Sequence, residues 1–274
     1  MTMTILLTGS KGFVGARIRE ALPVVEAPSL RDATDDDVKR LIDSVRPDVI
    51  VHTAAMSDIG DCARWPEAAR RANVDLPLLL AKAAGGAKLV MFSTDQVYSG
   101  CAEPGPYAEE TVAPDNLYAE LKIEMERRVL DIDPNAVMLR ATWMYDAPIY
   151  GILNRGNFLA NTIGAALRGE TMRASATEMR GITWVREVAA HIPETFTLPG
   201  GAYNYGSENT MTMLETTACL CDALGIKNRP EPAGHGHNLW MDCQKLRAAG
   251  IRFNTTAEGI AACVKAYALG PSGA

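Results

Sequence analysis

The stretch ILLTGSKGFVG, residues 5–15, passes from a short apolar run into glycines spaced three residues apart. This pattern predicts a buried strand, a tight turn and the first turn of a helix. Gly9 would allow the sharp bend, Gly12 would let a phosphate approach the backbone, and Gly15 would let the helix pack closely. Because free N–H groups at a helix start attract anions, we predict a dinucleotide pyrophosphate here, although an ordinary glycine-rich turn has the same composition. The expected cofactor contacts in this turn are Gly9, Gly12, Phe13, Val14 and Gly15.

Outward from this turn, the first half of the chain alternates short apolar runs with longer amphipathic segments. Strands are expected at residues 4–8, 48–54, 88–93 and 136–141, with a weak one at Val24 and Val25. Helices are expected at residues 12–21, 35–45, 65–84 and 116–131. Thr34 and Asp37 resemble a capping box at the second helix, and Pro77 should kink or break the third. The alternation predicts an α/β fold, with a Rossmann-type doubly wound parallel sheet over residues 1–145.

Beyond Trp143 the alternation loosens, and the sequence predicts a different, smaller unit. Helices are expected at residues 156–169, 211–224 and 257–269. The segment GITWVREVAA, residues 181–190, contains a short apolar run that would return the chain to the main body. We therefore expect a C-terminal substrate lobe made of residues 146–180 and 207–274, interrupted by a return to the dinucleotide-binding domain near 181–206.

Composition opposes several classes of protein. The formal net charge of −6 and the pI near 5.3 argue against binding to nucleic acid or to an anionic membrane surface. No apolar run reaches the roughly 20 residues that span a bilayer, and no secretion signal is visible. The six cysteines form no CxxC pair, which fits reduced thiols in the cytoplasm. His235 and His237 have no cysteine or carboxylate cluster beside them, so no metal site is expected.

Tyr118 and Lys122 form a YxxxK pattern, and their four-residue spacing places both side chains on one face of a predicted helix. An ammonium beside a tyrosine favours the phenolate and brings its pKa of about 10 nearer neutrality. Tyr118 is therefore the candidate donor of a proton to a carbonyl oxygen as hydride reaches the carbon. The spacing alone is weak evidence, so its location in the chain matters.

The strand that begins at Lys88 ends with Ser93 and Thr94, where the carboxyl edge of a parallel sheet opens onto its ligand crevice. Thr94 would hydrogen-bond the substrate oxygen, and Ser93 would lie beside the cofactor. Capping or turn formation is the alternative role for Thr94. With Tyr118 and Lys122, these residues predict a hydride-transfer site that uses NADPH or NADH.

The choice between the two cofactors stays open. Glu26 is the nearest acidic residue for a ribose 2′-hydroxyl, whereas Lys11 and Arg31 would meet a 2′-phosphate. Solvated surface charges would also account for Lys11 and Arg31. Asp32 is expected near the adenine.

A series of motifs extends over nearly the whole chain. They are TGSKGFVG, RPDVIVHTAAMSDIGDCA, RRANVDLPLLLAKAA, FSTDQVYSG, YAELK, LRATWMYD and MDCQKLRAAGI. In this order they make the chain similar to the extended short-chain dehydrogenases/reductases, among which it most resembles the dTDP-4-dehydrorhamnose reductase family. The resemblance implies NAD(P)H-dependent reduction of a 4-keto nucleotide sugar, with a homodimer as the candidate assembly.

The resemblance also implies roles for single residues. Those implied to contact or support the cofactor are Ala54, Ala55, Met56 and Asn73, with Lys122 at the nicotinamide ribose. Those implied to contact the substrate are Thr94, Trp143, Asn157 and Arg180, with Arg155 a further candidate for the diphosphate. A core position for Trp143, and solubility or local packing for the others, are the alternatives.

Departures from the family pattern leave other functions open. Met56 and Gln96 stand where the family commonly has aromatic residues, and HGHNLWMD replaces an Arg/Pro-containing stretch, so the nucleotide part of the substrate is undecided. Related dehydratases have Asp-Glu after the catalytic threonine, whereas Asp95 is followed here by an amide that cannot replace carboxylate proton transfer. Epimerisation and a noncatalytic, NAD(P)-binding regulatory subunit remain alternatives.

Overall fold

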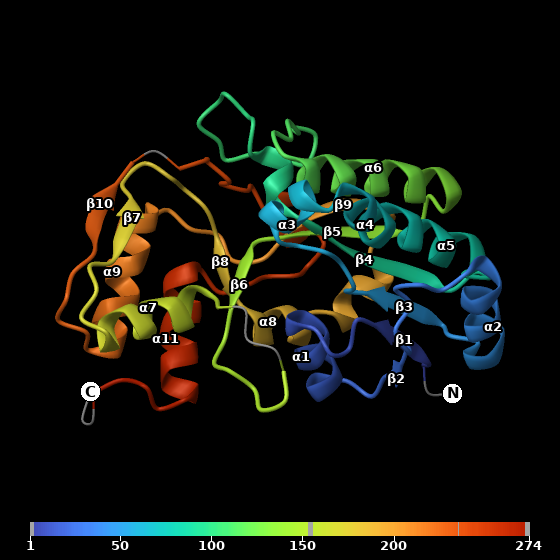
Figure 1. The fold of residues 1–274 in the computed structure, drawn as a ribbon, viewed down its shortest axis with the longest axis horizontal. Coiled ribbons are helices and arrows are strands. Elements are labelled where there is room, and N and C mark those ends of the chain that lie inside the picture. Colours follow the sequence, from blue (N-terminus) through green and yellow to red (C-terminus); the bar gives the residue numbers. More distant parts are fainter. Residues whose placement is uncertain (1–2, 153–155, 235, 272–274) are drawn as a thin grey trace.

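The computed structural model describes residues 3–152, 156–234 and 236–271. Within this part of the chain, the main sheet has six parallel strands in the order β2-β1-β3-β4-β5-β9 (Figure 1). They are β1 (Ile5–Thr8), β2 (Val25–Glu26), β3 (Val49–His52), β4 (Lys88–Thr94), β5 (Val137–Ala141) and β9 (Gly201–Tyr205). The order reverses at β1, so a ligand crevice opens at the carboxyl ends of β1 and β3. The predicted doubly wound α/β fold is confirmed.

Helices cover both faces of this sheet (Figure 1). One face carries α1 (Phe13–Ala21) and α8 (Val185–Ala190), and the other carries α2 (Asp35–Val45), α5 (Leu76–Ala83) and α6 (Leu117–Ile132). Along β1, Leu6 packs in the apolar cluster with α2, α5 and α6, whereas Ile5 and Leu7 pack in the cluster with α1 and α8. Burial on both faces explains why the strands are continuously apolar in sequence.

The predicted capping box opens α2. The Thr34 side chain accepts a hydrogen bond from the Asp37 backbone N–H at 3.2 Å, and the Asp37 carboxylate accepts one from the Thr34 N–H at 2.8 Å. Two N–H groups that the helix itself cannot pair are thereby satisfied.

The segment predicted as one helix over 65–84 is divided into α4 (Pro66–Arg70), a π-helical turn η1 (Arg71–Asp75) and α5. Pro77 lies in the first turn of α5 and has no N–H to donate to the preceding turn. The backbone widens into the π turn just before it, but the three helical segments follow one another without a break. A short helix α3 (Ile59–Arg64) precedes α4.

The second half of the described chain builds a smaller group of elements beside the sheet (Figure 1). It contains β6 (Trp143–Tyr145), α7 (Phe158–Leu167), β7 (Arg173–Ser175), β8 (Ile182–Trp184), α9 (Met213–Leu224), β10 (Glu231–Ala233) and α11 (Thr256–Ala266). Helix α10 (Gln244–Ala248) packs instead against β9 of the main sheet, and 3-10 turns η2 (Asp95–Tyr98) and η3 (Pro193–Thr197) lie elsewhere. Strand β6 pairs with β8, and β7 with β10. The chain returns to the main body for α8 and to the main sheet for β9, while the exact boundaries of the substrate lobe stay a prediction.

A buried carboxylate joins this smaller group to the main body. Asp146, which is fully buried, accepts hydrogen bonds from Arg17 Nε of α1 at 2.9 Å, Trp184 Nε1 at 2.8 Å and the Tyr267 hydroxyl at 2.7 Å. Buried charges require such partners, so this junction holds one side of the crevice in place.

In the part of the chain that the structure describes, no helix combines the length and the apolar composition that a membrane span requires.

Candidate active site

Two adjoining cavities follow the carboxyl ends of the central strands. One has a volume of about 510 Å³ and the other about 670 Å³. Both are lined by Lys11, Gly12, Thr53 and Ala55. They therefore form one cleft that crosses the glycine turn, a shape that suits a ligand with two ends joined by a pyrophosphate.

The three glycines of the turn have different surroundings. Gly9 has a φ of +76°, and a Cβ there would lie 2.7 Å from the Ala54 backbone N, while a Cβ at Gly15 would lie 2.2 Å from the Gly9 carbonyl oxygen. Both positions are therefore needed for the fold itself. A Cβ at Gly12 would meet only the Gly9 carbonyl oxygen within 4 Å, at 3.2 Å, and would otherwise enter the cleft. The open space beside Gly12 would let a pyrophosphate approach the backbone closely.

The 670 Å³ cavity lies between the loop after β2 and the loop after β3. Of the predicted cofactor residues, it is lined by Gly9, Gly12, Asp32, Ala54, Ala55 and Met56. Lys11 and Arg31 also line it, whereas Glu26 does not. The Glu26 carboxylate accepts a hydrogen bond from Arg19 at 3.3 Å, and a hydrogen bond with Ser10 is the main reason that its pKa is lowered. Lys11 and Arg31, the candidates for a 2′-phosphate, therefore line this end of the cleft, whereas Glu26, the candidate for a 2′-hydroxyl, does not.

Asn73 lies behind the cleft rather than on its surface. It occupies the π-helical turn and is fully buried, and its Nδ2 donates a hydrogen bond to the Met56 carbonyl oxygen at 2.9 Å. Neither cavity is lined by Asn73. The residue supports the loop after β3 from behind, and the π turn provides the local geometry.

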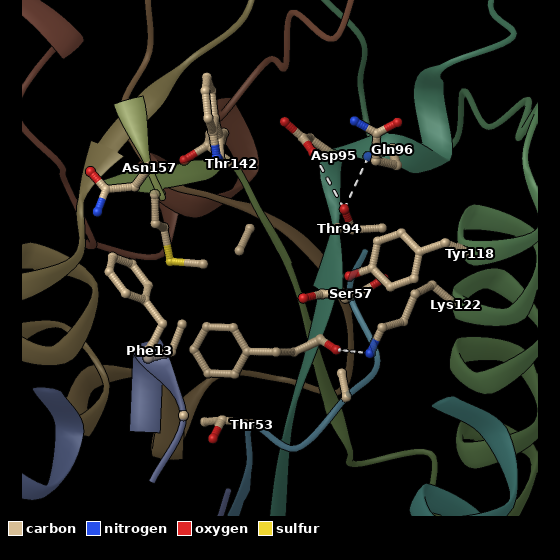
Figure 2. Close-up of a pocket in the computed structure, with 18 of the residues that line it drawn as sticks. Phe13, Thr53, Ser57, Thr94, Asp95, Gln96, Tyr118, Lys122, Thr142 and Asn157 are labelled. Carbon is tan, nitrogen blue, oxygen red and sulfur yellow. Dashed lines mark hydrogen bonds between the residues drawn. The ribbon is translucent and has the colours of Figure 1, made fainter. Parts of the chain in front are cut away.

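The 510 Å³ cavity contains the predicted catalytic residues. Figure 2 shows Thr94, Tyr118 and Lys122 on one wall, with Phe13 and Asn157 opposite. Thr94 ends β4, and Tyr118 and Lys122 project from the first turns of α6, whose N-cap is Asn116. Lys122 Nζ donates to the Phe92 carbonyl oxygen at 2.8 Å. An ammonium has three N–H donors, so Lys122 can hold this carbonyl and a ligand hydroxyl together.

Burial controls the protonation of this group. It raises the pKa of Tyr118 well above its usual range, and a hydrogen bond with Thr94 offsets only part of that effect. Burial lowers the pKa of Lys122 to about 8. The sequence-based expectation of a phenol brought toward neutrality by Lys122 therefore differs from the structure, because both side chains are almost fully removed from water. Tyr118 keeps its proton near neutral pH, as a proton donor must.

The residues predicted to contact the substrate, Trp143, Asn157 and Arg180, line the same cavity as Thr94. Arg180 is not free: its Nη2 donates to Asp95 Oδ2 at 2.6 Å, and its guanidinium lies 5.5 Å from the Trp143 ring centre. Asn157 caps α7 by accepting from the Ala160 N–H at 3.1 Å. Its Nδ2 donates to the Asp146 carbonyl oxygen at 3.0 Å, so this amide is largely engaged in holding the fold. Arg155 lies outside the described residues.

Several lining residues were missed by sequence reasoning. They are Thr53, Ser57, Ile59, Phe92, Ala141, Thr142, Met144 and Gly156, together with Asp95 and Gln96, which the sequence analysis named after Thr94 without assigning them to the site. Most follow the ends of β3, β4 and β5, so the position after a parallel strand was a usable signal. Asp95 is the most informative of them, because it accepts from Arg180 and also from the Thr94 hydroxyl at 3.3 Å.

The family model described as RmlD substrate binding domain matches residues 3–269. The chain belongs to the RmlD family. This RmlD-family chain is 30% identical over 283 residues to methionine adenosyltransferase 2 subunit beta of Xenopus tropicalis, covering 90% of this chain and 82% of that protein. It is also 30% identical over 197 residues to dTDP-4-dehydrorhamnose reductase of Burkholderia thailandensis, covering 68% of this chain and 63% of that protein.

Among solved structures, the RmlD-family chain is similar to dTDP-4-dehydrorhamnose reductase from Bacillus anthracis in complex with NADP. The TM-score is 0.86 at 20% identity, with 97% of this chain and 99% of that chain covered. This likeness shows the shared fold, and the predicted resemblance to the dTDP-4-dehydrorhamnose reductase family is confirmed.

Proposed function

We propose that this protein reduces a 4-keto nucleotide sugar with NADPH or NADH, in the manner of a dTDP-4-dehydrorhamnose reductase. The observation that carries the proposal is the convergence of Thr94, Tyr118 and Lys122 in a cavity continuous with the dinucleotide-shaped cleft. Family membership and the reductase relatives support it. The six cysteines, which are free thiols in the structure, support a cytoplasmic location, and a homodimer stays the candidate assembly.

Each catalytic residue has a distinct task in this reaction. The bound reduced nicotinamide supplies the hydride. Thr94 exchanges its hydrogen bond to Asp95 for one that it donates to the substrate carbonyl oxygen, and Tyr118 transfers its phenolic proton to that oxygen. Lys122 stabilises the phenolate that remains and holds a ribose hydroxyl while retaining its bond to Phe92. Burial raises the pKa of Tyr118, which favours the neutral phenol, the starting form that reduction requires.

The substrate end combines an aromatic face with a paired cation. Trp143 offers a flat apolar surface to a sugar ring, and Arg180 beside it is the candidate partner for a diphosphate. A substrate anion would compete with Asp95 and Glu178 for Arg180 and could displace one of them, because both carboxylates pair with the guanidinium in the cavity wall. This exchange would favour a dianionic diphosphate over a neutral sugar.

The decisive experiment measures net reduction across 4-keto nucleotide sugars with both cofactors. We expect stoichiometric loss of NAD(P)H and a hydroxyl product at C4, with dTDP-4-dehydrorhamnose the first substrate to test. Dehydration is disfavoured because Gln96 supplies an amide beside Asp95. An epimerised product formed without net cofactor consumption would replace reduction with redox-neutral epimerisation.

The basic end of the cleft leads to a prediction about cofactor choice. Arg31→Ala is expected to weaken NADPH binding about tenfold and to change NADH binding less than about twofold, because only NADPH offers a 2′-phosphate to the guanidinium. Dissociation constants from cofactor fluorescence test this. Arg252→Ala is the control, since this arginine does not line the cleft. Equal losses for both cofactors would assign Arg31 another role.

A regulatory subunit is the second candidate, favoured by the relatives named methionine adenosyltransferase 2 subunit beta that cover most of this chain. That function would retain cofactor binding without turnover. Co-purification with a catalytic subunit, together with inactivity across the ketosugar panel, would favour it. The complete set of Thr94, Tyr118 and Lys122 favours the reductase instead.

A further inference from the structure

A buried ion pair lies one helical turn beyond Lys122. Glu126 on α6 accepts hydrogen bonds from Arg140 on β5, at 2.7 Å from Nη2 to Oε2 and 3.0 Å from Nε to Oε1. The Ser93 hydroxyl of β4 donates to the same carboxylate at 2.5 Å. Glu126 and Arg140 are each 5% exposed. The carboxylate thus joins the catalytic helix to the strand that carries Thr94 and to its neighbour.

The arginine of this pair is itself held from several sides. Arg140 Nη1 donates to the Tyr98 hydroxyl at 3.0 Å and to the Glu109 carbonyl oxygen at 2.6 Å. The Tyr98 hydroxyl donates to Asn204 Oδ1 at 2.6 Å. The network therefore connects the end of β4 with β9 through groups that are buried and hydrogen-bonded. Such a network leaves Glu126 little freedom to move.

We propose that Glu126 is a positioning residue for the reaction, which fixes α6 against β4 and thereby places Lys122 and Tyr118 relative to Thr94. The inference rests on the proposed reductase function. A buried ion pair can be exchanged for apolar residues with little loss of stability, so stability alone does not require a charge here. A fixed anion beside a catalytic ammonium provides a reason for the charge.

The electrostatic surroundings of Lys122 define what a test should measure. On its own helix it faces Tyr118 and Glu126; from α3 it faces Cys62, and from β3 it faces His52. Burial lowers the pKa of His52 to about 3, so the ring is neutral and contributes no charge. Burial also lowers the pKa of Lys122, and Glu126 provides the largest opposing effect. Removing that anion should lower the Lys122 pKa further.

Glu126→Gln is the informative variant, and Glu124→Gln is its matched control. Glu124 lies on the same helix but pairs with Arg70 and Arg128 at the surface. We expect Glu126→Gln to move the alkaline limb of single-turnover reduction about one pH unit lower and to reduce kcat more than KM changes. Glu124→Gln should leave the limb and kcat near wild type. An unmoved limb in Glu126→Gln, or an equal shift in both variants, would overturn the proposal.

The pH dependence of NADPH affinity gives a readout that needs no turnover. Because the Lys122 ammonium is expected to hold the nicotinamide ribose, affinity should fall as Lys122 deprotonates, and Glu126→Gln should move this fall to lower pH. Inactivity of the wild type on every ketosugar would reject the reductase function, while this titration would still test Glu126. An unchanged titration would overturn the role of Glu126 even in an active reductase.

A second, more conservative variant tests the proposal if Glu126→Gln does not fold. Glu126→Asp keeps the negative charge but withdraws the carboxylate toward α6, away from Ser93 and Arg140. It should therefore fold, keep its alkaline limb within about 0.3 pH units of wild type and lose kcat about tenfold. Wild-type kcat in this variant would overturn the positioning role. A lowered kcat with an unmoved limb would support it.

Discussion

Tyr118→Phe should slow single-turnover reduction by about 10² to 10⁴, a loss of roughly 3 to 5 kcal/mol in transition-state stabilisation. The substitution removes the transferable proton and retains the ring, which belongs to the buried apolar cluster and lines the cavity. Cofactor affinity should therefore stay near wild type. Stopped-flow reduction and cofactor titration measure the two quantities separately.

Two further variants make this prediction specific. Tyr203→Phe is the control, because its hydroxyl bonds to the Pro199 carbonyl oxygen and the residue does not line the cleft. Lys122→Met should slow reduction and also weaken cofactor binding, since the ammonium acts on both Tyr118 and the ribose. If Tyr118→Phe matches the wild-type rate over a broad pH range, another group donates the proton.

Gly12→Val should abolish binding of both NADPH and NADH while the protein stays folded. Gly12 has φ −81° and ψ 174°, a conformation that a β-branched residue adopts without strain. Its added side chain would project into the part of the cleft shared by both cavities, where the pyrophosphate must approach the backbone. Cofactor titration and circular dichroism measure binding and folding independently.

The neighbouring glycines provide contrasting outcomes. Gly15→Ala should destabilise the protein before binding can be assessed, because its Cβ would lie 2.2 Å from the Gly9 carbonyl oxygen. Gly234→Val should change neither property, since a Cβ there meets no heavy atom within 4 Å. Unchanged cofactor affinity in a folded Gly12→Val variant would mean that the pyrophosphate lies elsewhere.

The first half of the fold was predictable because its signals are local. Continuous apolar strands, a glycine turn and the capping box at Thr34 each depend on residues close in sequence, and each is present in the structure. The strand pairs β6–β8 and β7–β10 were not predicted. Their members are three residues long and far apart in the chain, so neither length nor periodicity distinguishes them from loops.

The candidate site was predictable in composition but not in its internal bonds. Strand ends and the YxxxK pattern placed Thr94, Tyr118 and Lys122 together. No pattern indicated that Arg180 pairs with Asp95, 85 residues earlier, or that Asn157 caps α7. The sequence also did not indicate that Tyr118 is buried. Burial controls the pKa of Tyr118 more strongly than the neighbouring charge does. Such effects arise only after distant segments pack together.

The partners that meet at the Asp146 junction are synthesised at very different times. Tyr267, one of its hydrogen-bond donors, follows Asp146 by 121 residues, so the ribosome needs about 6 to 24 s to reach it. During that interval the Asp146 carboxylate lacks the Tyr267 hydroxyl as a partner, whereas Arg17 has already been synthesised. The glycine turn and Arg17 are therefore synthesised well before Tyr267, the donor that completes the junction on the other side of the crevice.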